Sequence, residues 1–286
     1  AAGAGTLALA GCAPDHFVHG DVNVARVTSL PDDPDDHRWL RSPQLDVELG
    51  PQDMALPLHL EPAVSSVRVR ALHDRERIAF LLEWDNADTD DLAIEVDEFR
   101  DACAVLLAPG PPAAELRPMG TATRPVTLLH WKADWQRDVD RGRQGLDAAY
   151  PNRSVDVYPP LYQTPPGEVG PDSYEDANAG QWLPGMYVDN PISIAGRSTP
   201  VEKLVAFGFG TSTHTAHQTA TGHGSRSDRG WRVIIARPLA AADDGEVDLS
   251  AGTVATAAFA VWSGGDGEVG SRKAPSTRVY SVFLER

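Results

Sequence analysis

Short hydrophobic runs, each broken within about ten positions by glycine, proline or a charged turn, follow one another along most of the chain. The stretch VSSVRVRALHDRERIAFLLEWDN contains two such runs in which hydrophobic and polar residues alternate, joined by a short charged segment. Alternation with a period of two is typical of strands that bury one face. It predicts a β-hairpin whose second strand carries Phe80, Leu82 and Trp84 on the same face.

Further strands are expected along the rest of the chain, bounded by turn residues. They lie within residues 91–109, 126–136, 203–211, 230–239, 255–264 and 278–285. In the second of these ranges, VTLLHWKADWQ, one strand is expected to hold both tryptophans. The spacing of the runs is that of hairpins, and no internal repeat suggests a propeller. The fold class predicted is therefore all-β with few short helices, an antiparallel β-sandwich of two sheets with long loops.

The runs also divide the chain. Residues 1–12 are predicted to be the remnant of a signal peptide, residues 13–45 are polar and are predicted to be an N-terminal linker, and residues 46–286 are predicted to form the sandwich domain. Within the domain, residues 137–203 are polar and irregular and are expected to be a long insertion. Long irregular insertions in compact domains are usually functional or face a partner.

Composition excludes one class of function. The chain has 286 residues, 42% of them hydrophobic, a formal net charge of −16 and a pI near 4.8. Such a chain can bury a large core. Its charge would repel a phosphate backbone, so nucleic acid is not an expected partner.

The two cysteines differ in their surroundings. Cys103, in DACAVLL, is expected to be a small buried hydrophobic residue. Cys12 ends TLALAGC, which resembles the lipobox of bacterial lipoproteins, in which the cysteine is acylated. An accidental leader rich in alanine, glycine and leucine is the alternative. A lipidated Cys12 would place the protein outside the cytoplasmic membrane, anchored to it.

Two residue types are scarce and bear on cofactor binding. Lysine occurs only at positions 132, 203 and 273, against 22 arginines, and methionine only at 54, 119 and 186. No C-x-x-C-H segment is present, so a covalently attached c-type haem is excluded and any haem would be held by axial ligands and packing. Taken alone, Met119 can be a loop filler and Lys273 a solvated turn lysine.

Other chemistries have weaker support. His214, His217 and His223 lie close enough in sequence to bind zinc or copper, but the Ser, Thr and Gly residues around them are typical of a flexible loop. No G-x-S-x-G, H-E-x-x-H or P-loop motif suggests hydrolysis. The seven tryptophans could include a sugar-stacking surface, although tryptophans on strands are more often core residues.

Four segments together resemble a known family. Residues 99–136 with PMG and HWKADWQ, residues 189–213 with GFGT, residues 230–239 with GWRVIIARPL, and residues 259–285 with the final lysine follow one another in order. This order is similar to that of the haem-binding gamma-subunit family of ethylbenzene dehydrogenase. Relatives in that family are the gamma subunits of dimethylsulfide dehydrogenase, selenate and chlorate reductases and nitrite oxidoreductase.

The resemblance implies one haem b at an edge of the sandwich, with Met119 and Lys273 as axial ligands. Lys132, Trp131, Trp262 and Arg272 are expected near the haem, with Lys132 the rival lysine and Met186 the rival methionine. Lysine can ligate iron once its amine is neutral, which arginine cannot become. With both axial positions filled, the implied task is electron transfer rather than catalysis.

The implied setting is an exported molybdenum oxidoreductase complex. In it, the haem subunit exchanges electrons with an iron–sulfur beta subunit, which contacts a molybdopterin alpha subunit, and with a soluble cytochrome or a quinone-linked carrier. The location implied is the periplasm or the outer face of the cytoplasmic membrane. The alternative is a haem-free, lipid-anchored β-sandwich that binds a glycan or another extracellular ligand.

Overall fold

The structure is a computed structural model that describes residues 20–113, 116, 119–143, 145–152, 184–188, 190–194, 196–250 and 254–285. In chain order the strands of this part are β1 (Val22–Arg26), β2 (Leu45–Glu48), β3 (Ser66–His73), β4 (Arg77–Asp85), β5 (Ala102–Pro109), β6 (Val126–Lys132), β7 (Val201–Ala206), β8 (Thr213–His214), β9 (Thr221–Arg226), β10 (Gly230–Pro238), β11 (Ala255–Trp262), β12 (Ala274–Pro275) and β13 (Tyr280–Leu284).

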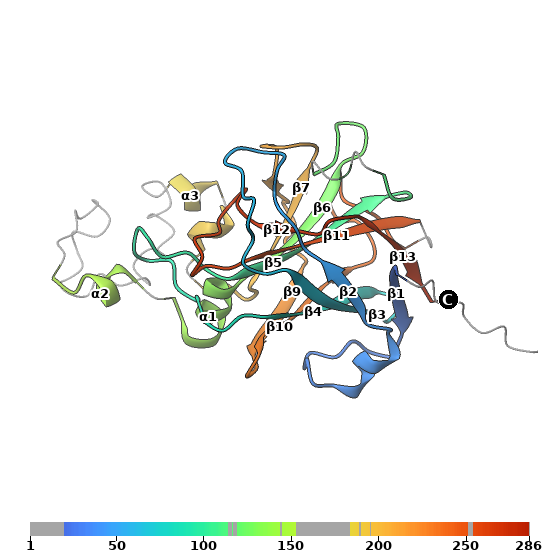
Figure 1. The fold of residues 1–286 in the computed structure, drawn as a ribbon, viewed down its shortest axis with the longest axis horizontal. Helices are drawn as coiled ribbons and strands as arrows, with labels where there is room; N and C mark the ends of the chain where they lie inside the picture. The colour runs from blue at the N-terminus through green and yellow to red at the C-terminus, as the bar shows by residue number, and fades with distance from the viewer. Residues whose placement is uncertain are drawn as a thin grey trace, which may run out of the picture.

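Short helices accompany the strands. They are η1 (His37–Arg41), α1 (Ala133–Arg141), α2 (Leu146–Ala149), α3 (Pro184–Tyr187) and η6 (Pro191–Ser193). The α-helices gather at the end of the molecule opposite the chain's C-terminus (Figure 1). Among the described residues, no helix combines the length and the apolar character needed to cross a membrane.

The strands form one continuous path that folds over on itself. Its order is β8-β7-β6-β5-β11-β13-β1-β3-β4-β10-β9, with β12 beside β11 and β2 beside β3. We call β5, β6, β7, β8 and β11 the first half and β2, β3, β4, β9 and β10 the second half. The prediction of an all-β sandwich is confirmed. The described pairings are antiparallel except at β1, which runs parallel to both β13 and β3, and so the sheet is mixed.

The main core lies between the two halves. Tryptophans from both halves meet there: the Trp131 ring on β6 lies 6.3 Å from that of Trp84 on β4 and 4.9 Å from that of Trp231 on β10. Cys103 is fully buried in the same core, in its predicted environment. Because side chains alternate along a strand, every second residue of β5, β6 and β11 points the other way, to the outer face of the first half.

The predicted hairpin is confirmed as β3 and β4, with Phe80, Leu82 and Trp84 in the core. The single strand expected over residues 126–136 is wrong in its second part, because β6 ends at Lys132 and α1 begins at Ala133. A spacing of four residues puts two side chains on the same face of a strand and also on the same face of a helix, so it could not distinguish the two, and Trp135 lies on the buried face of α1.

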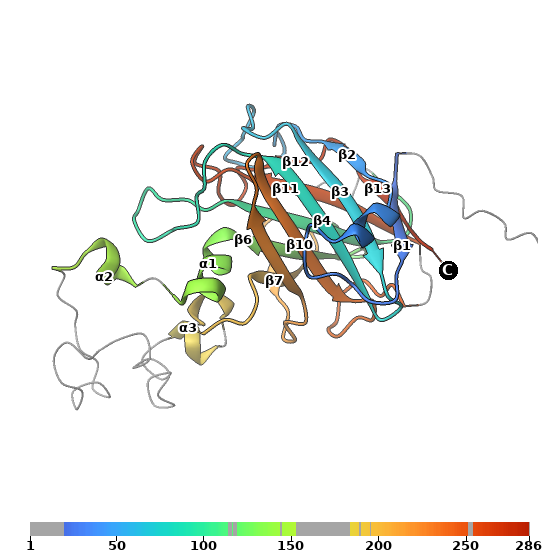
Figure 2. The same ribbon diagram turned by 90° about the horizontal axis from the view of Figure 1, so that it is seen from below.

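Residues 20–45 correct the predicted linker. β1 completes the sheet between β13 and β3, and η1 packs over the outer face of the second half (Figure 2). Trp39 of η1 is 2% exposed and contacts the cluster that contains Leu72, Leu81 and Ile234. The polar segment therefore belongs to the domain, because one buried aromatic residue and a five-residue strand secure it.

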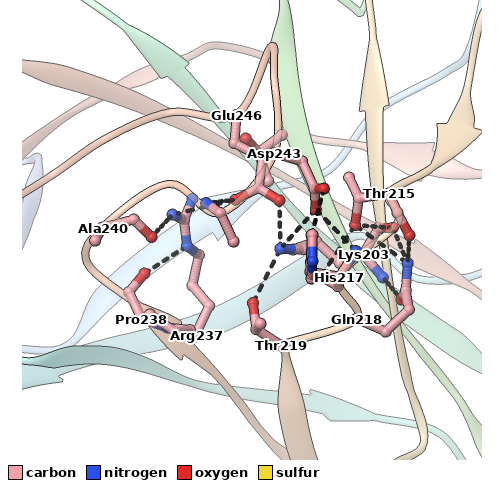
Figure 3. A network of polar contacts seen from close by, with 12 residues as sticks. Lys203, Thr215, His217, Gln218, Thr219, Arg237, Pro238, Ala240, Asp243 and Glu246 are labelled. Atoms are coloured by element: carbon pink, nitrogen blue, oxygen red, sulfur yellow. Dashed lines mark hydrogen bonds and ion pairs between the residues drawn. The ribbon is translucent and has the colours of Figure 1, made fainter.

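A buried group of charged side chains joins β7 of the first half to β10 of the second half (Figure 3). We call Lys203, Arg237, Asp243 and Glu246 the Lys203 network. The fully buried Lys203 ammonium on β7 pairs closely with Glu246, lies 3.7 Å from Asp243 and donates to the Thr219 hydroxyl at 2.9 Å. Arg237 on β10 approaches the other Glu246 oxygen at 3.7 Å. The network thus links β7, β10 and the loop before β11.

Candidate functional site

Met119 lies in a tight turn between β5 and β6. Its φ of +66° is in the left-handed region, which residues other than glycine adopt only at an energetic cost. Two hydrogen bonds hold the turn: the Met119 N–H donates to the Leu116 carbonyl at 3.1 Å, and the Gly208 N–H donates to the Met119 carbonyl at 3.0 Å. The partly buried side chain packs against the outer face of the first half. The strained turn therefore fixes where the thioether is presented.

Gly120 allows this turn to close. Its φ is +84°, and an added Cβ would lie 2.8 Å from the Arg124 carbonyl oxygen and 2.9 Å from a Val126 methyl group. We expect Gly120→Ala to lower the free energy of unfolding by about 1–3 kcal/mol, through backbone strain and this clash. The matched control is Gly142→Ala, where φ is +79° but no atom lies within 4 Å, so it adds strain alone. Urea unfolding measures both variants, and equal losses would show that the close contact costs nothing.

Lys273 lies in the turn between β11 and β12. Its Nζ is 5.4 Å from the centroid of the Trp262 ring, and within the described ranges the ammonium has no hydrogen bond or ion pair. Burial lowers the pKa of Lys273 from 10.5 to about 8, because a charged ammonium loses solvation inside the protein. The amine of Lys273 therefore loses its proton to give a free lone pair at lower pH than an ordinary lysine does.

The surface between these two turns is the outer face of β5 and β11. Its central side chains are small, and we call them the alanine face: Ala102, Ala104, Ala258 and Ala260. Ala104 pairs with Ala260 across the two strands. The Met119 side chain packs at the Ala258 end of this face, and Trp262, beneath the Lys273 amine, lies at the Ala102 end. The two donors thus lie on one side of the sheet, at opposite ends of a row of small apolar side chains.

His130 completes this surface and was missed by sequence reasoning. Its ring stacks on Trp262 at 4.8 Å with an interplanar angle of 30°. Burial, reinforced by the positive charges of Lys132, Arg100 and Lys273, holds the pKa of His130 well below 6.5. Its buried Nε2 has no hydrogen-bond partner in the described part of the chain. The alternation of β6 places His130 outward, but only the fold brings Trp262 against it.

The other predicted pocket residues separate into three groups. Trp262 and Arg272 lie with Lys273 in the segment from the end of β11 to β12, and the Arg272 guanidinium lies 5.8 Å from the Phe99 ring. Lys132 points outward but is already engaged, since its ammonium pairs closely with Glu202. Trp131 points into the main core, on the opposite face of β6 from His130.

The rival lysine, Lys132, therefore differs from Lys273. The Lys132 ammonium also lies 3.7 Å from the centroid of the Trp135 ring, so it braces α1. The Met186 side chain and Cys12 lie outside the described residues.

The three histidines considered as a metal site do not form one. His214 lies on β8 and His223 on β9, while His217 Nδ1 lies 2.8 Å from an Asp243 carboxylate oxygen. Over the described ranges, no group of three or more His, Cys, Asp or Glu side chains is arranged to hold a metal ion. The histidine-rich segment is instead tied to the loop of the Lys203 network.

The donor set fits the haem expected from the sequence. A thioether and a neutral amine can both ligate iron, and neither needs a charged partner. The alanine face offers small apolar side chains between them, and the unpartnered His130 Nε2 offers a hydrogen bond at its border. The arrangement holds no nucleophile–base pair of the kind that hydrolysis requires.

Similarity to solved structures is weak. A protein of Bacteroides uniformis described as a "putative carbohydrate-binding protein" aligns over 93% of this chain and 91% of its own length, at 11% identity. Its TM-score of 0.39 is too low to show a shared fold or function.

Comparisons of sequence are more informative. The "Dimethylsulfide dehydrogenase subunit gamma" of Rhodovulum sulfidophilum is 26% identical over 249 residues, which cover 83% of this chain and 69% of the relative. The "Putative respiratory nitrate reductase heme subunit ORF7" of Haloferax mediterranei is 21% identical over 253 residues, covering 88% of this chain and 68% of the relative. The family model described as ethylbenzene dehydrogenase matches residues 36–274, a range that includes both Met119 and Lys273. The chain therefore belongs to the ethylbenzene dehydrogenase family.

Proposed function

We propose that this protein is an electron-transfer subunit that binds one non-covalent haem b, with Met119 and Lys273 as the axial ligands of the iron. One observation carries the proposal: Lys273, whose pKa burial lowers to about 8, has no charged partner in the described part of the chain and lies across the alanine face from Met119. A half-buried lysine without a counter-charge loses part of its solvation with no ion pair to offset the loss, and ligation of a metal ion by the neutral amine would remove this cost.

The two side chains suit a redox role. When bound, the haem would supply a one-electron couple between ferric and ferrous iron. A thioether is a soft, neutral ligand that favours the ferrous form and raises the potential relative to two nitrogen ligands. With Met119 on one side and Lys273 on the other, no open coordination position would remain for a substrate or oxygen. The subunit would therefore carry electrons and would not be the site of substrate chemistry.

The relatives supply the setting of the proposal. Their names describe a gamma subunit of dimethylsulfide dehydrogenase and a haem subunit of a respiratory nitrate reductase. We infer that this chain works in a comparable molybdenum oxidoreductase complex, exchanging electrons with its iron–sulfur subunit and with a soluble or membrane carrier. Acylation of Cys12 would hold that complex at the outer face of the cytoplasmic membrane.

A cofactor assay tests the proposal. The full chain, purified and reconstituted with haem, is expected to develop a Soret band, and a pyridine haemochrome assay is expected to give a b-type spectrum with one haem per chain. Extraction with acidified butanone should remove the haem, because no thioether bond to cysteine holds it. Protein that shows no Soret band after reconstitution would contradict the proposal and would favour a haem-free binding domain.

A further inference from the structure

His130 has a ring nitrogen whose partner is missing from the described protein. Its Nε2 is buried without a hydrogen bond, while the ring stacks on Trp262. Leaving a buried polar atom unpaired is unfavourable, and such atoms in folded proteins call for an explanation. A phenylalanine could make the same stacking contact without that cost. The nitrogen therefore points to an acceptor that a bound group would bring.

The charges around His130 indicate that the acceptor is an anion. The positive charges of Lys132, Arg100 and Lys273 all act on its ring. Lys132 and Arg100 are neutralised by carboxylates, because they pair with Glu202 and Asp134 respectively. Arg272, next to Lys273 in sequence, has no carboxylate partner in the part of the chain that the structure describes. Arg272 is thus a cation without a carboxylate partner next to Lys273, and His130 has an unpaired hydrogen-bonding nitrogen.

We propose that His130 binds a carboxylate of the haem, with its Nε2–H as the hydrogen-bond donor. The inference rests on the proposed function, since the haem is the group that brings the carboxylates. Lys132, two positions later on the same strand, is not free for this role because its ammonium pairs with Glu202. A neutral imidazole can donate one hydrogen bond, and a bond to a charged acceptor is stronger than one between neutral groups.

The experiment compares haem with haem dimethyl ester, in which both carboxylates are blocked. Each is titrated into the full chain, and the dissociation constants are read from the Soret band for the unchanged protein, His130→Phe and His130→Gln. We expect the unchanged protein to prefer haem over the ester, and His130→Phe to reduce this preference by about tenfold or more. His130→Gln should keep part of the preference, because its amide can still donate. His223→Phe, a change on an exposed residue of β9, should leave it intact.

The outcomes separate this inference from the proposed function. If the protein binds haem in a low-spin form but His130→Phe leaves the preference unchanged, the carboxylate contact is refuted and the proposed function stands. If His130→Phe loses the low-spin spectrum while Lys273→Ala keeps it, His130 is an iron ligand and the inference is wrong. If neither haem nor its ester binds to folded protein, both fail. Circular dichroism shows whether each variant is folded.

Discussion

Lys273→Ala is expected to convert the ferric haem from a low-spin to a high-spin form and to weaken haem binding by more than about tenfold. Mutation of a residue that only supports a metal ligand typically lowers metal affinity by about 10–100-fold, and the loss of the ligand itself should cost at least as much. Lys273→Arg should behave like the alanine variant, because a guanidinium keeps its proton and offers iron no lone pair. Absorption and electron paramagnetic resonance spectra of the ferric variants measure this. A low-spin spectrum that survives in Lys273→Arg would remove Lys273 from the ligand set.

The same residue sets an expected pH dependence. Below its pKa of about 8 the Lys273 amine is protonated in the haem-free protein and must release a proton before it can bind iron. Haem affinity should therefore rise by about tenfold per pH unit up to about pH 8 and level off above it. The affinity of Lys273→Ala should lack this rise. A pH profile shared by the variant and the unchanged protein would contradict the assignment.

Glu246→Ala is expected to destabilise the fold more than any other single change considered for the sandwich. The change leaves the buried Lys203 ammonium and Arg237 guanidinium without their closest counter-charge, with only Asp243 still 3.7 Å from Lys203. Removing one partner of a buried ion pair typically costs about 3–5 kcal/mol. Urea unfolding at neutral pH measures the loss.

The control for Glu246→Ala is Asp85→Ala. Asp85 also faces two arginines, Arg68 and Arg229, at 3.0 and 2.8 Å, but its side chain is 53% exposed. Exposed pairs contribute about 0–1 kcal/mol, so this variant should lose little. A loss for Glu246→Ala that is no larger than that for Asp85→Ala would mean that the Lys203 network does not stabilise the sandwich.

The sequence predicted a strand correctly wherever the hydrophobic pattern of that strand alone reflected its burial. The alternation in residues 64–86 placed β3 and β4 correctly, and the apolar runs of β10 and β11 were recognisable because both strands are buried on nearly every side. β1 was not recognisable, because its five residues gain their burial from β13 and β3, which are distant in sequence. Likewise the change from β6 to α1 could not be recognised, because no glycine or proline lies between Trp131 and Trp135 to mark the end of the strand.

In the candidate site, too, some residues could be predicted from the sequence, while their placement could not. Met119 and Lys273 were proposed from a family resemblance and from the chemistry of their side chains, and their scarcity in the chain made them noticeable. Their placement at two ends of one apolar face depends on the pairing of β5 with β11, which no local pattern specifies. That pairing, together with the pairing of β5 with β6, brings Trp262 against His130, and so the role of His130 could not be found from its position in the sequence.

The central claim is that Met119 and Lys273 hold one haem iron between them. Near-infrared magnetic circular dichroism tests it most directly, because the energy of the ferric charge-transfer band depends on the pair of axial ligands. The reconstituted protein should give a band typical of thioether and amine ligation. Met119→Ala and Lys273→Ala should each lose it, while Met54→Ala, a change at a 44% exposed methionine, should keep it. An unaltered band in either ligand variant would contradict the account.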